Sequence, residues 1–185
     1  HSNIDINTGK CNECAHQFVA TISTDGSAPT GYDTLADCLD SITADTGNYV
    51  KIYQDIGDAS ATAILDTIDV KHNVMIDLNG HKLNNIKLGV NKLGVNKDVT
   101  LTLTGTAGSY VTQVYVRKGG GSFIIDSEAN VEFNTIFVED SARLAVNDGA
   151  KVTTEQLTVI ASVNDDGTTT TSVKLATGMK LGGLT

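Results

Sequence analysis

The first side chains with reactive chemistry are two cysteines and a histidine near the start of the sequence. The run Cys11-Asn-Glu-Cys14 places two thiols three positions apart, and His16 follows two positions later. A C-x-x-C pair is half of a typical zinc site, to which His16 or Cys38 would add ligands, but no second C-x-x-C follows. A redox-active pair would open a helix after a strand, a context that is missing here. Three interpretations stay open, in this order: a structural cap, a disulfide, and a zinc site formed by Cys11, Cys14 and His16.

Carboxylates are the next candidates, because pairs of them occur where turns are predicted. A glycosidase needs two convergent carboxylates at a defined separation, which a sequence does not reveal. We favour solvated turn residues, which keep the exposed sides of the molecule soluble. The pairs are Asp55 with Asp58, Asp126 with Glu128, Glu139 with Asp140, and Asp165 with Asp166.

Aromatic side chains that could stack on sugar rings are few. The chain has no Trp, five Tyr and four Phe. Tyr110 and Tyr115 flank one predicted strand, and Tyr115 lies between the inward residues Val114 and Val116, so that its side chain is expected to point outward. A single outward tyrosine is a weak sugar site.

The charge balance excludes two classes of partner. The chain carries 13 basic and 22 acidic residues, a net charge of −9. Nucleic acids and anionic membrane surfaces both require clustered Lys and Arg. No apolar run reaches the ~20 residues of a membrane span, so we expect no membrane insertion.

The elements that would position these side chains change type near residue 48. Apolar residues recur at helical spacing over residues 33–46, with Asp33 as the expected N-cap and Gly47 as the expected C-terminal stop. Residues 16–23 alternate as a strand does. Beyond Tyr49 the helical period is lost, and strand-like pieces start at Val50, Val74, Val99, Ser122, Arg143 and Ser172, with steps of 24, 25, 23, 21 and 29 residues.

Matched apolar positions indicate that these pieces belong to an internal repeat. At an offset of 21, the matched pairs are Phe123 with Leu144, Ile125 with Val146, Ala129 with Ala150, Val131 with Val152, Ile136 with Leu157, and Val138 with Val159. At an offset of 22, they are Leu101 with Phe123, Leu103 with Ile125, Ala107 with Ala129, Val114 with Ile136, and Val116 with Val138. At an offset of 29, they are Leu144 with Val173, Val146 with Leu175, Gly149 with Gly178, and Val152 with Leu181.

A unit of this length cannot bury its apolar side alone, but stacked copies form one continuous core. Spacings of 21 to 25 residues fit a coil of three short strands, and the 29-residue step implies a loop insertion. We therefore predict an all-β fold: a right-handed single-stranded parallel β-helix of about six coils over residues 49–185, with a small N-terminal α/β cap over residues 1–48. The alternative is a β-sandwich. The last coil has no comparable cover, which indicates a fragment of a longer protein or an end covered by a partner.

The stretch Val74-Met-Ile-Asp-Leu-Asn-Gly-His-Lys-Leu83 resembles a coil of right-handed parallel β-helix proteins. It is similar to the pectate-lyase-like repeat regions of surface proteins from Gram-positive gut bacteria, over about residues 30–160. In this motif Ile76 and Leu78 are expected to point inward, and Asn79-Gly80 supplies a turn that tolerates positive φ. This structural explanation is favoured over a catalytic role for Asp77 or His81.

The resemblance also implies what an enzyme of this fold would need. Lyases of this kind bind Ca²⁺ through aspartates and use a surface Arg or Lys as the base. The only arginines are Arg117 and Arg143, so an enzyme would bring one of them close to two of the acidic turns.

We predict a non-enzymatic structural or adhesive β-helix module of a secreted or cell-surface bacterial protein. It would be extracellular or attached to the cell wall and would bind a host protein or a glycan through its outer faces. The alternative is a fragment of a carbohydrate-active enzyme, a polysaccharide lyase or a glycoside hydrolase. A third hypothesis is a segment of a trimeric fibre. No cofactor is expected, apart from zinc at the N-terminal cysteines or calcium at the acidic turns.

Overall fold

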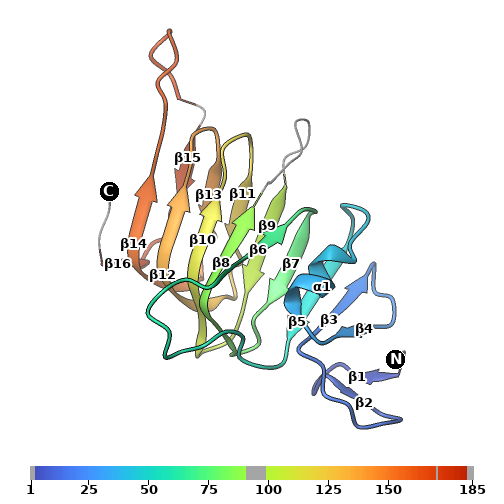
Figure 1. Cartoon of the computed structure of the whole chain (residues 1–185). Coiled ribbons are helices and arrows are strands. Elements are labelled where there is room, and N and C mark those ends of the chain that lie inside the picture. The colour runs from blue at the N-terminus through green and yellow to red at the C-terminus, as the bar shows by residue number, and fades with distance from the viewer. Residues whose placement is uncertain (1–2, 91–98, 170, 183–185) are drawn as a thin grey trace.

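The computed structural model describes residues 3–90, 99–169 and 171–182. Its main body is a parallel β-helix of about five turns, in which each turn adds one strand to each of two sheets (Figure 1). The eight-stranded sheet contains, in spatial order, β15 (Ser172–Lys174), β13 (Arg143–Val146), β11 (Ser122–Ile125), β9 (Thr100–Thr104), β7 (Val74–Asp77), β5 (Asn48–Ile52), β3 (Ala20–Thr24) and β4 (Thr30–Tyr32). The six-stranded sheet contains β16 (Lys180–Leu181), β14 (Lys151–Val159), β12 (Asn130–Val138), β10 (Ser109–Val116), β8 (Lys82–Val90) and β6 (Asp66–Val70).

The predicted parallel β-helix is therefore confirmed and the β-sandwich is wrong, because consecutive coils pair in parallel. The stack has about five turns rather than six. The strands of the last coil, β15 and β16, are only three and two residues long.

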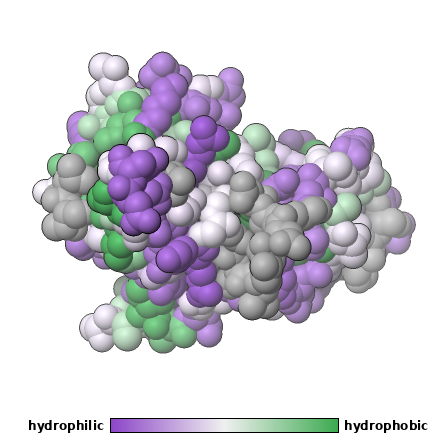
Figure 2. Space-filling model, turned by 90° about the horizontal axis from the view of Figure 1, so that it is seen from above, coloured by the Kyte–Doolittle hydropathy of each residue, from purple (hydrophilic) through white to green (hydrophobic). Residues whose placement is uncertain are grey.

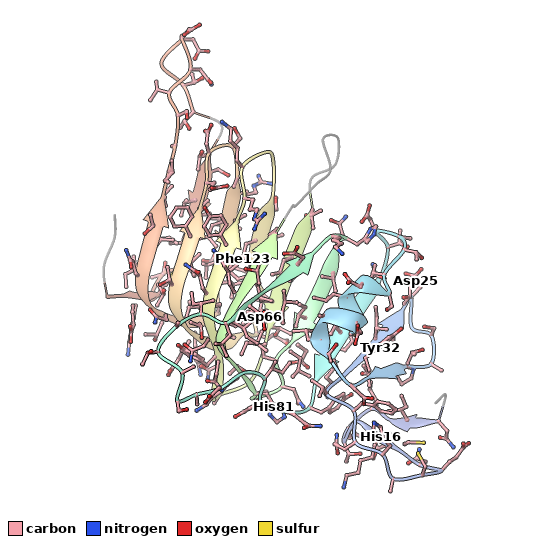
Figure 3. All side chains as sticks on the ribbon, viewed as in Figure 1. His16, Asp25, Tyr32, Asp66, His81 and Phe123 are labelled. Atoms are coloured by element: carbon pink, nitrogen blue, oxygen red, sulfur yellow. The ribbon has the colours of Figure 1, made fainter. Side chains whose placement is uncertain are left out.

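The strand pairing confirms the offsets in the middle of the stack. Phe123 pairs with Leu144 at an offset of 21, and Leu101 pairs with Phe123 at an offset of 22. Alternate inward residues are fully buried as a result, and Phe123 lies between the two sheets with its ring edge against Phe133, 5.9 Å between centroids (Figure 3). The offset fails for Ala107, which is exposed although Ala129 is buried.

The offsets outside the middle differ from those predicted. Val74 pairs with Leu101, a step of 27 rather than the 25 that separates the expected strand starts. In the last coil Leu144 pairs with Val173 as predicted, but Leu181 pairs with Thr154 rather than with Val152. The register changes after the matched turn glycines, because Leu181 follows Gly178 by three positions whereas its partner Thr154 follows Gly149 by five.

Each long strand of the six-stranded sheet is bent, so a coil has three inward-facing segments, as the spacing predicted. In β12 the inward residues Val131 and Phe133 are separated from Ile136 and Val138 by two residues that both lie outside the core. The pairing with β10 skips one position at the same place. This change of phase is what turns the chain around one corner of the coil.

The N-terminal segment covers the first coil and shares its core. Strand β3 pairs antiparallel with both β4 and β5, and the short helix α1 (Leu35–Asp40) contacts β6, β3 and β4 (Figure 1). Leu35, Cys38 and Leu39 of α1 belong to the same buried cluster as the inward residues of the stack. The hairpin of β1 (Ile4–Asp5) and β2 (Lys10–Cys11) lies beyond this layer.

The helix is shorter than the sequence suggested, and its N-cap is Thr34 rather than Asp33. Thr34 Oγ1 accepts a hydrogen bond from the N–H of Asp37 (3.0 Å), which satisfies one free donor of the first turn. The helix ends at Asp40, and Ser41 is its C-cap, with the Ser41 hydroxyl donating to the carbonyl of Cys38 (2.7 Å). No helix within the described ranges has the length and apolar content that a membrane crossing requires.

Candidate functional site

The N-terminal cysteines lie in a small hairpin outside the main core. Cys11 ends β2 and is 2 % exposed, whereas Cys14 lies in the following turn and is exposed. Hydrogen bonds from the Cys14 thiol and from the backbone N–H groups of Glu13 and Cys14 lower the pKa of the Cys11 thiol. The His16 side chain contacts the residue before the N-cap of α1: its Nε2 lies 2.6 Å from Asp33 Oδ1.

Cys38 lies on the buried face of α1, in a different apolar cluster from Cys11, and burial raises the pKa of its thiol to about 12. In the part of the chain that the structure describes, no three His, Cys, Asp or Glu side chains are placed to hold a metal ion together. Zinc binding by Cys11, Cys14 and His16 stays a prediction.

The carboxylates of three acidic turns accept hydrogen bonds from the backbone of the same turn. Asp58 Oδ1 accepts the N–H and the hydroxyl of Ser60, and Asp166 Oδ1 does the same for Thr168, so the pKa of each carboxyl is lowered. Asp126 Oδ1 accepts the N–H of Glu128 at 3.0 Å. These bonds agree with a role as solvated turn residues, and calcium binding stays a prediction.

The motif that carries the family resemblance has the structural role expected of it. Ile76 and Leu78 are fully buried, and Asn79 and Gly80 turn the chain with φ of 50° and 84°. The Asn79 amide donates to the carbonyl of Ile52 in the preceding coil (3.1 Å), which ties the two turns together.

Asp77 points away from the core into a hollow on the outer face of the eight-stranded sheet. It accepts hydrogen bonds from the Tyr49 hydroxyl (2.9 Å) and from the N–H of Asn79 (2.8 Å). Asp126 and Glu128 line the same hollow. Burial and the Asp77 carboxylate raise the pKa of Tyr49 above its usual range.

Tyr115 and Phe137 form a stacked pair on the outer face of the six-stranded sheet. They pair in register between β10 and β12, and their rings are nearly parallel, with centroids 4.6 Å apart and planes 3° apart. The spacing matches that of adjacent strands, so one ring rests on the other along the stack. Both side chains are half-buried.

Two cations lie against this pair. Lys87 Nζ is 4.4 Å from the centroid of the Tyr115 ring, and the guanidinium of Arg117 is 5.8 Å from it. Such contacts stabilise each cation by roughly 0.5–1 kcal/mol at exposed sites. Among the described residues neither cation forms an ion pair, and the Nε of Arg117 is buried without a hydrogen-bond partner.

Glu139, the nearest acid along the coil, is already engaged. Its Oε1 accepts the Tyr115 hydroxyl at 2.6 Å, and its Oε2 accepts the N–H of Lys118 at 2.7 Å. The hydrogen bond to Glu139 is the main reason why the pKa of Tyr115 is raised. We call Lys87, Tyr115, Arg117, Phe137 and Glu139 the aromatic face.

Sequence reasoning expected an outward Tyr115 but missed its partner Phe137. The signal was present, because the offset of 22 that aligns Val114 with Ile136 also aligns Tyr115 with Phe137. In the described ranges neither Arg117 nor Arg143 forms an ion pair with an acidic turn.

A second hollow lies on the six-stranded sheet, around Tyr110. Lys82, Tyr110, Glu132 and Thr153 follow one another across four adjacent strands, and the loop before β6 closes one side with Ala59 and Ala61. This hollow is polar and contains no stacked ring pair. We therefore consider the aromatic face the stronger candidate.

Comparison of the chain with protein-family models, with curated proteins and with solved structures finds no match.

Proposed function

We propose that this chain is a non-enzymatic structural or adhesive β-helix module that binds a protein partner through its aromatic face. The observation that carries the proposal is the convergence of Lys87 and Arg117 on the stacked rings of Tyr115 and Phe137. Tyr, Phe and Arg are the side chains enriched at the centres of protein interfaces.

The charges indicate the chemistry of the partner. The chain carries a net charge of −9, yet Lys87 and Arg117 have no ion-pair partner among the described residues. Glu139 is occupied by Tyr115 and Lys118. A partner that presents carboxylates would supply the missing counter-charges, and the Arg117 guanidinium would bind a carboxylate through two parallel hydrogen bonds.

The ring geometry favours a protein over a glycan. A sugar stacks on a free aromatic face, but Phe137 covers one face of Tyr115 and Lys87, which comes from the preceding coil, lies over the other. Both side chains are only half-buried, so part of their surface stays exposed. This exposed part, next to Lys87 and Arg117, suits the mixed polar and apolar contacts of a protein surface.

The same proposal places the module outside the cell, in a secreted or wall-attached bacterial protein that meets host surfaces. The motif at residues 74–83 supports this location through its resemblance to surface proteins. The rigid stack supports it physically, because an extended β-helix displays its side chains at fixed spacing.

The test uses beads coated with the chain and applied to cultured host epithelial cells. Replacing both Tyr115 and Arg117 with Ala should weaken adhesion about tenfold or more, the effect of removing an interface hot spot. Tyr110→Ala is the matched control, since Tyr110 lies on the same strand and also points outward. Unchanged adhesion by the double variant, or loss of adhesion by Tyr110→Ala alone, would contradict the proposal.

Treating the cells distinguishes the partner class. Protease treatment of the cells should abolish adhesion, whereas mild periodate oxidation of their sugars should leave it unchanged. The opposite pattern would identify a glycan as the partner.

A carbohydrate-active enzyme is the second candidate, favoured by the three carboxylates of Asp77, Asp126 and Glu128 around one hollow. Incubation with neutral and acidic polysaccharides, followed by an assay for new reducing ends, tests it. Product that disappears with Asp126→Ala, a variant that keeps the Tyr49–Asp77 hydrogen bond, would favour the enzyme.

A further inference from the structure

The N-terminal hairpin holds two thiols in contact at the surface of the molecule. Cys11 closes β2, where it pairs with Ile4, and the turn that follows brings Cys14 back over it. The turn is closed by two backbone hydrogen bonds, from Ala15 to the carbonyl of Cys11 and from Cys11 to the carbonyl of His16, both 2.9 Å.

The two sulfur atoms lie within hydrogen-bonding contact. The Cys14 thiol donates to the sulfur of Cys11, and Figure 3 shows sulfur atoms side by side in this hairpin, close to the labelled His16. Their accessibility differs, because Cys14 is exposed while Cys11 is 2 % exposed. An exposed thiol with a sheltered neighbour is the arrangement of an attacking and a resolving cysteine.

We propose that Cys11 and Cys14 form a thiol–disulfide exchange site that closes into a disulfide on meeting a small-molecule disulfide such as glutathione disulfide. This site is separate from the aromatic face and goes beyond the proposed function.

The exchange proceeds in two balanced steps. Cys14, the exposed one of the two, loses its proton to solvent, and its thiolate attacks one sulfur of the external disulfide, whose S–S bond breaks. One thiolate leaves with the electron pair and takes up a proton. Cys11 then attacks the Cys14 sulfur of the mixed disulfide and expels the second thiol. The chain loses two thiol hydrogens and two electrons, and the external disulfide is reduced to two thiols.

The reaction has a structural consequence for the hairpin. The Tyr53 hydroxyl donates to the carbonyl of Ile6 in the loop between β1 and β2 (2.8 Å), so the hairpin rests on the first coil. A disulfide across the turn would lock the outer end of the hairpin, in a compartment oxidising enough to keep it closed.

Cys38 serves as an internal control within the same molecule. Its thiol is fully buried in the main core, in a different cluster from Cys11. As long as the chain stays folded, an external disulfide should not reach Cys38, which should remain a free thiol.

The test treats the full, reduced chain with glutathione disulfide under native conditions, followed by acid quenching, alkylation and peptide mass mapping. We expect loss of the Cys11 and Cys14 thiols, no retained glutathione and an intact Cys38 thiol. In Cys38→Ala the Cys11 and Cys14 thiols should be lost in the same way. Retention of both N-terminal thiols, or equal modification of all three cysteines, would overturn the proposal.

Two variants test the order of attack. Cys11→Ser should keep one glutathione on Cys14, because the resolving thiol is missing, whereas Cys14→Ser should take up none on Cys11. Glutathione trapped on Cys11 in the second variant would overturn the order. In the unmodified chain, thiols that react only after zinc is removed by a chelator would overturn the exchange site in favour of a metal site. The unmodified chain gives a decisive result even if a variant fails to fold.

Discussion

The middle and the C-terminal end of the stack carry the same kinds of inward side chain but bury them differently. Leu144 lies between Phe123 and Val173 of the two neighbouring coils and is 1 % exposed. Val173 occupies the same inward position one coil later and is 37 % exposed, as are Leu175 and Leu181. Seen from above, hydrophobic surface gathers at the end of the molecule that holds the last coils (Figure 2).

The difference shows that the burial of an inward side chain in this fold depends on its position in the stack and not on its residue type. A coil covers its inward side chains from one side only, and the next coil completes the cover. At the opposite end the first coil is completed by β3 and α1. The residues at the last coil therefore contribute less to stability than identical residues in the middle.

The largest effect is expected in the middle of the stack. Phe123→Ala removes a fully buried ring that contacts Phe133. It should lower the free energy of unfolding by about 3–5 kcal/mol, because a cavity opens between two rigid sheets. Denaturant unfolding followed by circular dichroism measures the change. A loss below ~1 kcal/mol would show that the two sheets collapse around the cavity.

A pair of leucines tests the comparison itself. Leu144→Ala should cost about 2–5 kcal/mol, as buried leucines do. Leu175→Ala in the last coil should cost about 1 kcal/mol or less, since its side chain is already partly in water. Equal losses in the same unfolding experiment would show that the last coil is covered as well as the middle.

Two turn glycines extend the test to the backbone. Gly149 and Gly178 both adopt positive φ, 104° and 90°, so either change to Ala costs about 1 kcal/mol of backbone strain. A Cβ on Gly149 would also lie 3.0 Å from the Ser127 carbonyl oxygen of the preceding coil, whereas one on Gly178 would meet nothing within 4 Å. Gly149→Ala should therefore lower the melting temperature more than Gly178→Ala. A larger loss in Gly178→Ala would contradict the close contact between Gly149 and the preceding coil.

The smallest effect is expected at the N-terminal, covered end of the stack, in the pH dependence of the melting temperature. The pKa of Tyr49 is raised in the folded chain by burial and by Asp77, while an unfolded tyrosine has a pKa near 10. Its contribution to stability is complete below pH ~10 and is lost as pH rises further, since the unfolded state loses the proton first. Tyr49→Phe should make the fall in melting temperature above pH ~10 less steep. An identical fall in both proteins would exclude Tyr49 as a source.

The sequence was sufficient to predict the stack and its inward residues where coils have equal length. Phe123, Ile125 and Val138 could be placed because alternation and an offset of 21 or 22 agree over two coils. Leu181 could not, because two residues fewer after the turn glycine shift the register without changing the apolar pattern. The same limit applies to Val74, whose partner Leu101 follows a longer step.

The candidate site was predictable only in part. Alternation places Tyr115 outward, and the offset adds Phe137 once it is applied to outward positions as well. The approach of Lys87 to Tyr115 depends on the irregular pairing between β8 and β10, which no period in the sequence reveals. The engagement of Glu139 depends on a turn conformation that only the structure shows.

Coils related by an offset of 22 stack directly and so create the aromatic face. The most direct measurement is a nuclear Overhauser effect between ring protons of Tyr115 and Phe137 in the folded chain, confirmed by its loss in Phe137→Leu. With centroids 4.6 Å apart, a strong effect is predicted. Its absence, with both rings assigned, would contradict the register and the aromatic face together.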